Sequence, residues 1–223
     1  MPSLTVENYV KMIYLISARL PEGEAVSTGD LAHALVVSPG TVTGMLKTLS
    51  EANLSIYTPY EGARLTPSGR RLALTVLRRH RLVELFLAHT LSMPWDEVHE
   101  EAEHMEHAVS ERLVDRIDAF LGHPAVDPHG DPIPRADGSF AETVGQPLSS
   151  LNPGQTFRLV RVVDQDKSFL RYLTESGLDL GTKGVLVENR PEAGAVTIRV
   201  GERAVALGME AAGKVLVSPD VER

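Results

Sequence analysis

The chain has 223 residues, of which 43% are hydrophobic and 23% charged, the composition of an ordinary globular protein. It has no cysteine, which excludes disulfides and thiolate metal ligands. It also has no apolar run near the roughly 18 residues of a membrane span and no leader-like N-terminus, so we expect a cytoplasmic protein without a membrane partner. The net charge of -8 divides into +3 over residues 1–83, -10 over residues 84–140 and -1 over residues 141–223, so the overall acidity does not exclude a nucleic-acid partner.

The first elements predict a helix-turn-helix. Apolar residues at helical spacing indicate an amphipathic helix over Val6–Arg19. Ser27 followed by Asp30 fits a capping box that opens a second helix. Ser38-Pro39 fits an N-cap and a proline at the first helical position, opening a third helix that runs to about Ala52. Two short helices joined by three or four residues form this motif, although it also occurs in proteins that do not bind DNA.

The third helix and the segment after it predict a winged DNA reader. Small hydroxyl residues, glycines and one lysine lie opposite the apolar stripe of the helix, which suits close approach to a DNA groove. Leu54–Tyr60 and Ala63–Thr66 flank Glu61-Gly62 and predict a β-hairpin that would form the wing. The candidate DNA-binding residues are Ser38, Pro39, Gly40, Thr41, Thr43, Lys47, Tyr60 and Arg64.

Two long helices are expected next. The first begins at Thr66-Pro67, and most of the local positive charge comes from its arginines at positions 70, 71, 78, 79 and 81. The second is expected from Trp95 to Leu121, with an apolar stripe typical of a core or a dimer seam. Prolines and glycines then indicate a loop over His123–Phe140.

The last third of the chain has a β-rich pattern. Five short strands and one short helix after Leu151 predict a small barrel. We therefore expect a mainly α N-terminal part, consisting of a winged helix-turn-helix and two long helices, followed by a small all-β barrel. The expected bounds are 1–70 for the DNA-binding domain, 71–140 for the helical domain after it, 141–150 for a linker and 151–223 for the barrel.

The acidic middle of the chain contains candidate metal ligands. On one continuous helix, His99, Glu103, Glu106 and His107 would share an arc of about 100° beside the apolar stripe. Half-buried carboxylates repel one another unless a cation neutralises them. His80 and Glu84 stand four residues apart on the preceding helix. The alternative is a solvated acidic face, which is our expectation for Glu100, Glu101 and His104.

These residues resemble a known family. Arg79-His80-Arg81-Leu82-Val83-Glu84, Val98-His99-Glu100-Glu101-Ala102-Glu103 and Met105-Glu106-His107 are similar to the metal-binding motifs of the DtxR/MntR family of iron- and manganese-dependent repressors. Ser38 to Thr43 resembles its recognition helix, and Asp127 to Pro134 resembles the loop that closes its dimerisation domain. The tail from Leu148 is similar to the SH3-like, FeoA-type domain of the longer members. The resemblance thus implies that residues 71–140 form a helical metal-binding and dimerisation domain and that residues 151–223 form an SH3-like barrel.

The resemblance implies two neighbouring metal sites. The primary site would use Asn8, Glu103, Glu106 and His107, and the ancillary site would use His80, Glu84 and His99. The SH3-like domain would lend a ligand from among Asp164, Gln165 and Asp166. Oxygen donors at positions 8 and 103 favour Mn(II), with Fe(II) as the other candidate. Lys11 stands where manganese-type members have a glutamate, and Asn8 stands where they have an aspartate.

The expected function is a metal-dependent repressor of manganese or iron homeostasis that is not an enzyme. Metal would fix two recognition helices of a homodimer for a palindromic operator on double-stranded DNA. One alternative is a winged-helix regulator that senses a non-metal ligand. Another is a metalloenzyme, although no motif for a general acid or base accompanies the ligands.

Overall fold

The computed structural model describes residues 3–142 and 144–220 of the chain. These residues form two compact units. The first consists of the residues up to His80 together with Glu106–Val109 and Pro134–Ser139. The second consists of Arg81–Met105, Ser110–Ile133 and the chain from Phe140 onward. The long helix α4 (Pro67–Leu91) begins in the first unit and ends in the second.

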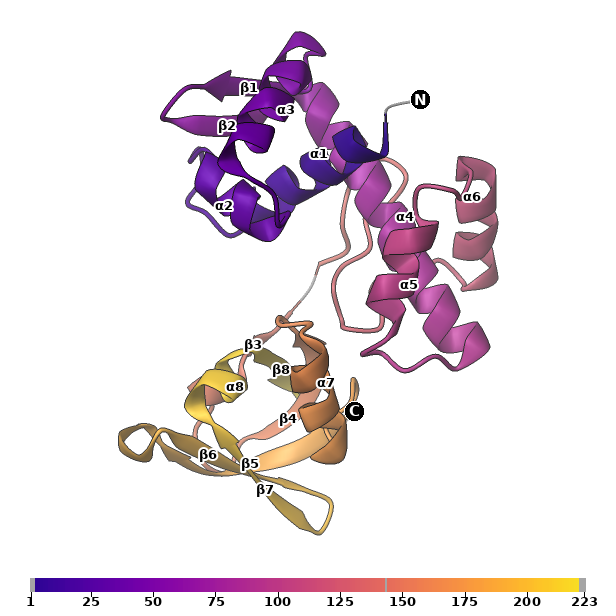
Figure 1. Cartoon of the computed structure of the whole chain (residues 1–223). Helices are drawn as coiled ribbons and strands as arrows, with labels where there is room; N and C mark the ends of the chain where they lie inside the picture. Colours follow the sequence, from indigo (N-terminus) through magenta and orange to yellow (C-terminus); the bar gives the residue numbers. More distant parts are fainter. Residues whose placement is uncertain (1–2, 143, 221–223) are drawn as a thin grey trace. The chain divides into compact units, whose positions relative to one another are not determined.

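The first unit is the expected winged helix-turn-helix. Its elements are α1 (Leu4–Ser17), α2 (Thr28–Ala34), α3 (Pro39–Glu51), β1 (Ser55–Thr58), β2 (Gly62–Leu65) and the start of α4 (Figure 1). The predicted caps are present: Ser27 Oγ accepts from the backbone N–H of Asp30 at 3.0 Å, and Ser38 Oγ accepts from that of Thr41 at 3.2 Å. Each cap satisfies a backbone donor at the start of its helix, which fixes where α2 and α3 begin.

The helices and the hairpin of this unit enclose one apolar core. Its fully buried members include Ile13 of α1, Leu31 of α2 and Leu46 of α3. The antiparallel hairpin is extended by a single bridge between Val26 and Ala63. Gly62 was expected in the turn but pairs with Thr58 in the ladder. Its φ of +113° and the backbone of Val26, which a Cβ would meet at 2.4 Å, explain why a glycine stands there.

The second unit contains the end of α4 and two shorter helices, α5 (Val98–Met105) and α6 (Glu111–Phe120). The prediction of one helix from Trp95 to Leu121 is therefore wrong. Ser110 starts a new helix, because its Oγ accepts from the backbone N–H of Leu113 at 3.3 Å. The predicted apolar stripe is divided as well: Val98 and Ala102 are buried, whereas Met105 and Leu113 are exposed.

A six-stranded antiparallel sheet forms the rest of the second unit, with the order β3-β8-β4-β5-β6-β7 among the described residues. The strands are β3 (Gln146–Pro147), β4 (Thr156–Val162), β5 (Lys183–Arg190), β6 (Ala195–Val200), β7 (Arg203–Gly208) and β8 (Val215–Pro219). The short helices are η1 (Leu148–Ser150), α7 (Lys167–Glu175), η2 (Pro191–Ala193) and α8 (Met209–Gly213). Phe157, Leu173 and Leu186 are among the side chains that fill its core.

The SH3-like barrel is thus confirmed, with two additions. The sequence pattern missed α8, and it missed β3, which pairs with β8 inside the stretch expected to be a linker. A two-residue strand has no periodicity of its own, so only its partner strand identifies it.

Candidate metal centre and DNA-reading face

Glu106 is the most deeply buried carboxylate among the expected ligands, with an exposed fraction of 0%. It lies in the segment between α5 and α6 and not on a continuous helix. The prediction that Glu106 and His107 share a helical arc with His99 and Glu103 is therefore wrong, because these two residues are not on that helix. Their position is set by tertiary contacts, since residues 106–109 belong to the first unit.

The Glu106 carboxylate has cationic or polar partners on both oxygens. Lys11 Nζ of α1 donates to Oε1 at 2.7 Å, and His80 Nδ1 of α4 lies 2.7 Å from Oε2. Burial raises the pKa of Glu106, but the hydrogen bond and charge of His80 and the charge of Lys11 outweigh it, so the pKa lies below its ordinary value. Glu106 is thus held as a carboxylate, the form that binds metal ions.

His107 is oriented by a residue that the sequence did not indicate. Its Nδ1 lies 2.8 Å from Oε2 of Glu7, and Arg79 donates to the same Glu7 oxygen at 3.3 Å. Arg79 also donates to the backbone carbonyl of Glu106 at 3.1 Å. A carboxylate that accepts from one imidazole nitrogen fixes the ring and leaves the other nitrogen for a metal. The spacing of Glu7 and Lys11, four residues apart beside Asn8, was the only signal available in the sequence.

The residues of this site fit a divalent cation. Oδ1 of Asn8 and Nε2 of His107 are buried and have no hydrogen-bond partner within the described part of the chain. Nε2 of His107 lies 3.2 Å from Oε1 of Glu106. Two ligands at adjacent positions on an ion with bonds of about 2.1 Å are about 3 Å apart. Buried acceptors without donors are costly unless a cation satisfies them.

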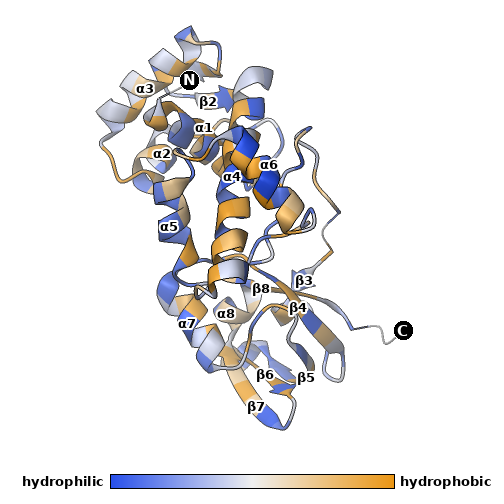
Figure 2. Cartoon of the chain, turned by 90° about the vertical axis from the view of Figure 1, so that its right-hand side faces the viewer, coloured by the Kyte–Doolittle hydropathy of each residue, from blue (hydrophilic) through white to orange (hydrophobic). Residues whose placement is uncertain are grey.

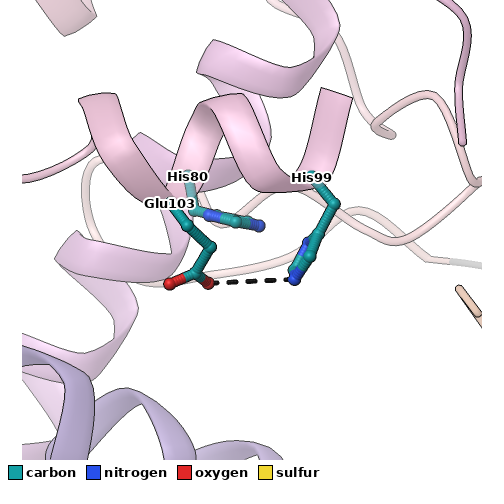
Figure 3. Close-up of side chains that lie close together, drawn as sticks. All are labelled: His80, His99 and Glu103. Atoms are coloured by element: carbon teal, nitrogen blue, oxygen red, sulfur yellow. Dashed lines mark ion pairs between the residues drawn. The ribbon is translucent and has the colours of Figure 1, made fainter. Parts of the chain in front are cut away.

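The residues expected to form the ancillary metal site occur in both units. His80 precedes Glu84 by one turn of α4. Within the second unit, Glu84 Oε1 lies 3.1 Å from His99 Nδ1, and His99 Nε2 lies 3.9 Å from Glu103 Oε1. Figure 3 draws this His99–Glu103 pair as a dashed line, together with His80. Glu84 is almost fully buried, whereas His99 and Glu103 are half-buried.

Two further residues accompany Glu84 that the sequence analysis did not single out as ligands. One ligand atom each from Glu84, Asp127 and His129 lies within 4.8 Å of the other two, and all three residues are buried. Asp127 Oδ2 and His129 Nδ1 have no hydrogen-bond partner in the described part of the chain. Burial first, and then the charges of Glu84 and Asp131, raise the pKa of Asp127 well above its ordinary value. Arg81 Nε lies 3.6 Å from Asp127 Oδ2 and lowers this pKa, but it does not outweigh the other causes, so Glu84 and Asp127 repel one another unless a further cation is present.

His129 is fixed in place by Trp95. Its Nε2 lies 2.7 Å from the backbone carbonyl of Trp95, and the two rings are stacked with centroids 6.1 Å apart. With Nε2 facing a carbonyl, Nδ1 is the nitrogen left for an ion. The resemblance had placed both Asp127 and His129 in the loop after α6, and only the fold brings them to Glu84.

The ligand expected from the SH3-like domain has other partners. Asp164 pairs with Lys214 at 3.1 Å, and Asp166 caps α7 by accepting from Ser168 and Phe169. Gln165 donates to Asp131 at 3.1 Å. Asp131 also pairs with Arg81 and Arg161, so it is already neutralised by cations.

The DNA-reading face lies on α3 and the hairpin. Ser38, Pro39, Gly40, Thr41 and Lys47 are exposed there, and Thr43 is half-exposed. The hydroxyls of this face bond within the helix: Ser38 to Thr41 at 2.9 Å and Thr43 to the carbonyl of Pro39 at 3.0 Å. The hydroxyls of Ser38, Thr41 and Thr43 thus each already have one hydrogen-bond partner within the helix.

The wing residues are also exposed. Tyr60 projects fully from the hairpin tip, whereas the Nε of Arg64 donates to the carbonyl of Gly23 at 2.7 Å and anchors the wing. The positive charge expected from the arginines of α4 is only partly present at the surface. Arg70 and Arg71 are exposed, but Arg78, Arg79 and Arg81 are buried. Arg79 and Arg81 neutralise carboxylates inside the protein.

Three protein-family models match the chain. The model described as "Iron dependent repressor, N-terminal DNA binding domain" matches residues 1–63. "Iron dependent repressor, metal binding and dimerisation domain" matches residues 66–135, and "FeoA domain" matches residues 146–219.

Individual relatives agree with these matches. "Iron-dependent repressor IdeR" from Mycobacterium leprae (strain TN) is 30% identical over 96% of both chains. "HTH-type transcriptional regulator MntR" from Geobacillus kaustophilus (strain HTA426) is 32% identical over 52% of this chain and 80% of its own. A solved structure described as "Manganese-dependent transcriptional repressor complex with manganese" has a TM-score of 0.84 at 39% identity and covers 96% of this chain and 99% of its own.

The fold and the matches define a metal-dependent DNA-binding regulator with a dimerisation domain. The chain belongs to the DtxR/MntR family of iron- and manganese-dependent transcriptional repressors, in its long form with a C-terminal FeoA domain. The family consists of transcriptional repressors and not of enzymes, which excludes the metalloenzyme alternative. No helix in residues 3–142 and 144–220 has the length and hydropathy needed to cross a bilayer.

Proposed function

We propose that this chain is a cytoplasmic repressor of manganese or iron homeostasis that binds a palindromic operator as a homodimer when Mn(II) or Fe(II) is bound. The observation that carries the proposal is a pair of buried acceptors, Asn8 Oδ1 and His107 Nε2, that have no hydrogen-bond donor among residues 3–142 and 144–220. They lie in the unit that contains the buried Glu106. We assign DNA reading to residues 1–70, metal binding and dimerisation to residues 71–140 and the SH3-like domain to residues 151–223, joined by residues 141–150.

The primary site would consist of Asn8, Glu103, Glu106 and His107. Asn8 belongs to α1 of the DNA-reading unit, and Glu106 and His107 belong to the segment between α5 and α6. An ion that takes a ligand from each segment would supply a positive charge that fixes α1 against the metal-binding segment. These nitrogen and oxygen ligands favour Mn(II) over softer ions, and Fe(II) is the second candidate.

The ancillary site would use His80, Glu84 and His99, as the resemblance implies, with Asp127 and His129 added. The 3.1 Å contact between Glu84 and His99 supports the first group. The buried Glu84–Asp127–His129 cluster supports the addition, because a cation would relieve its repulsion and satisfy its orphaned atoms.

Operator recognition would use the DNA-reading face of α3 and the wing. With the hydroxyls of Ser38, Thr41 and Thr43 bonded within the helix, apolar contact with thymine methyl groups is the readout that this surface favours. Two copies related by a twofold axis would place their α3 helices about one DNA turn apart. Exposed apolar residues on α6, including Leu113 and Phe120, support dimerisation through this helix. Figure 2 shows that the ribbon of α6 carries both hydrophobic and hydrophilic segments.

The test begins with selection of duplexes from a random-sequence DNA pool by the protein in the presence of Mn(II). Fluorescence anisotropy then measures the affinity for the selected duplex with Mn(II), with Fe(II) under anaerobic conditions, and after chelation. Metal should tighten binding by about 5–150-fold. Glu106→Gln should lose this response, and Glu101→Gln, at an exposed position of α5, should keep it.

Equal affinity after rigorous chelation would refute the proposal. Absence of Mn(II) and Fe(II) uptake in equilibrium dialysis would instead favour a winged-helix regulator that senses a non-metal ligand.

A further inference from the structure

Lys11 is a buried cation next to the proposed primary site. It lies on α1 with an exposed fraction of 4%, and its Nζ is 2.7 Å from Oε1 of Glu106. Burying an ammonium group is costly unless an anion compensates it. Lys11 stands one turn after Glu7 and Asn8, so α1 presents a carboxylate, an amide and an ammonium group to the same region.

The contacts of Glu106 limit how many ions it can bind. Its Oε2 lies 2.7 Å from His80 Nδ1, and its Oε1 lies 2.7 Å from Lys11 Nζ and 3.2 Å from His107 Nε2. A carboxylate that bridges two ions gives one oxygen to each. Here one oxygen faces the His80 imidazole, and the other already faces both the Lys11 ammonium group and His107 Nε2, so the carboxylate is not placed to give one oxygen to each of two ions.

The charges around Glu106 in the first unit also indicate that it binds a single ion. Around Glu106, the anionic carboxylates of Glu7 and Glu106 have Arg79 and Lys11 as hydrogen-bonded cationic partners. A second divalent ion at Glu106 would meet a fixed positive charge within contact distance, and like charges at such a separation repel strongly where water is excluded. The ammonium group thus provides the compensation that a second ion would otherwise give.

We propose that Lys11 is a built-in second cation of the primary site, which restricts this site to one ion and weakens its affinity for that ion. The inference rests on the proposed function, because it requires Glu106 and His107 to hold an ion. It concerns the number of ions and the metal concentration at which the repressor responds, which the family membership leaves open.

The experiment is a Mn(II) titration of the full-length protein, with unbound Mn(II) measured by electron paramagnetic resonance. Lys11→Met removes the charge and keeps a long unbranched side chain in the buried position. Lys11→Glu replaces the cation with an additional ligand. Lys183→Met is the control, since it removes an exposed lysine from β5, away from the DNA-reading face and the proposed metal ligands. Glu106→Gln identifies the ion that belongs to the primary site.

Lys11→Met should bind the same number of ions as the wild type, with the primary ion held at least about tenfold more tightly, because even partial relief of a contact-distance repulsion is worth that much. Lys11→Glu should take up one additional ion. Lys183→Met should match the wild type in both the number of bound ions and their affinity.

The inference is overturned if Lys11→Met binds the primary ion no more tightly than the wild type, or if folded Lys11→Glu takes up no additional ion. Circular dichroism checks folding, and Lys11→Met decides alone if Lys11→Glu does not fold. If Glu106→Gln binds as many ions as the wild type, the proposed primary site itself fails. If Glu106→Gln loses one ion while Lys11→Met behaves like the wild type, only the role of Lys11 fails.

Discussion

Replacing Glu7 tests whether a residue that does not itself bind the ion controls the affinity of the site. Glu7 accepts from His107 Nδ1 at 2.8 Å and from Arg79 at 3.3 Å. In Glu7→Ala the imidazole loses the acceptor that fixes its tautomer and orientation. Loss of such a partner costs about 10–100-fold in metal affinity. This corresponds to about 1.4–2.7 kcal/mol of binding free energy.

The assay is a Mn(II) titration at constant pH, with thermal unfolding of the metal-free protein in parallel. Glu7→Ala should also lower the free energy of unfolding by about 1–3 kcal/mol, because it removes a buried acceptor from Arg79 and His107. Glu7→Gln keeps an oxygen acceptor for His107, so its loss of affinity should be smaller than that of alanine. Glu22→Ala, at an exposed position before α2, is the control and should change neither quantity.

Two outcomes would refute this reasoning. Wild-type Mn(II) affinity in folded Glu7→Ala would mean that the orientation of His107 does not limit binding. Equal losses in Glu7→Gln and Glu7→Ala would mean that the negative charge of Glu7, and not its hydrogen bond, supports the site.

Three further changes have separable expected outcomes. Gly44 is an exposed residue of α3 at which a Cβ would meet nothing within 4 Å. Gly44→Ala should raise the free energy of unfolding by up to about 1 kcal/mol, because alanine favours the helix. It should weaken binding to the selected duplex by about 1–3 kcal/mol if the added methyl group meets the DNA, and unchanged anisotropy would show that Gly44 does not approach the duplex. Phe120 is 66% exposed on α6, so Phe120→Asp should give monomers by light scattering and abolish tight operator binding. The control Leu4→Asp, at a leucine 59% exposed on α1, should remain dimeric. A dimeric Phe120→Asp protein would contradict dimerisation through α6. Asp127→Asn should stabilise the metal-free protein near neutral pH, because the raised pKa of Asp127 means that folding disfavours its ionised form, and this gain should vanish as the pH falls below the unfolded value of about 3.9. Mn(II) should raise the unfolding temperature of this variant less than that of the wild type. An undiminished effect of Mn(II) in differential scanning fluorimetry would argue against Asp127 as a ligand.

The sequence was most informative where local chemistry decides the structure. Ser27 and Ser38 cap their helices in the structure as expected, because an N-cap depends on residues only three positions apart. The strands of the barrel follow from alternation within each strand. The candidate ligands His80, Glu84, His99, Glu106 and His107 were chosen from residue type and resemblance, and the last two lie in a unit with Asn8 and Lys11.

The metal centre was less predictable, because its geometry depends on contacts between distant segments. Glu106 pairs with Lys11, which precedes it by 95 residues, and His107 pairs with Glu7, which precedes it by 100. No local pattern reveals such pairs. Helical periodicity even predicted the wrong local structure, because an uninterrupted apolar stripe concealed the break at Ser110.

The sequence by itself thus determined the winged helix-turn-helix, the barrel and the kinds of atoms available to a metal, since these depend on neighbouring residues and on composition. Only the tertiary structure decided that Lys11 neutralises Glu106, that Glu7 orients His107 and that Asp127 and His129 meet Glu84. The physical reason is that burial makes each of these charges dependent on a specific partner, and the partner is chosen by the packing of segments far apart in the chain.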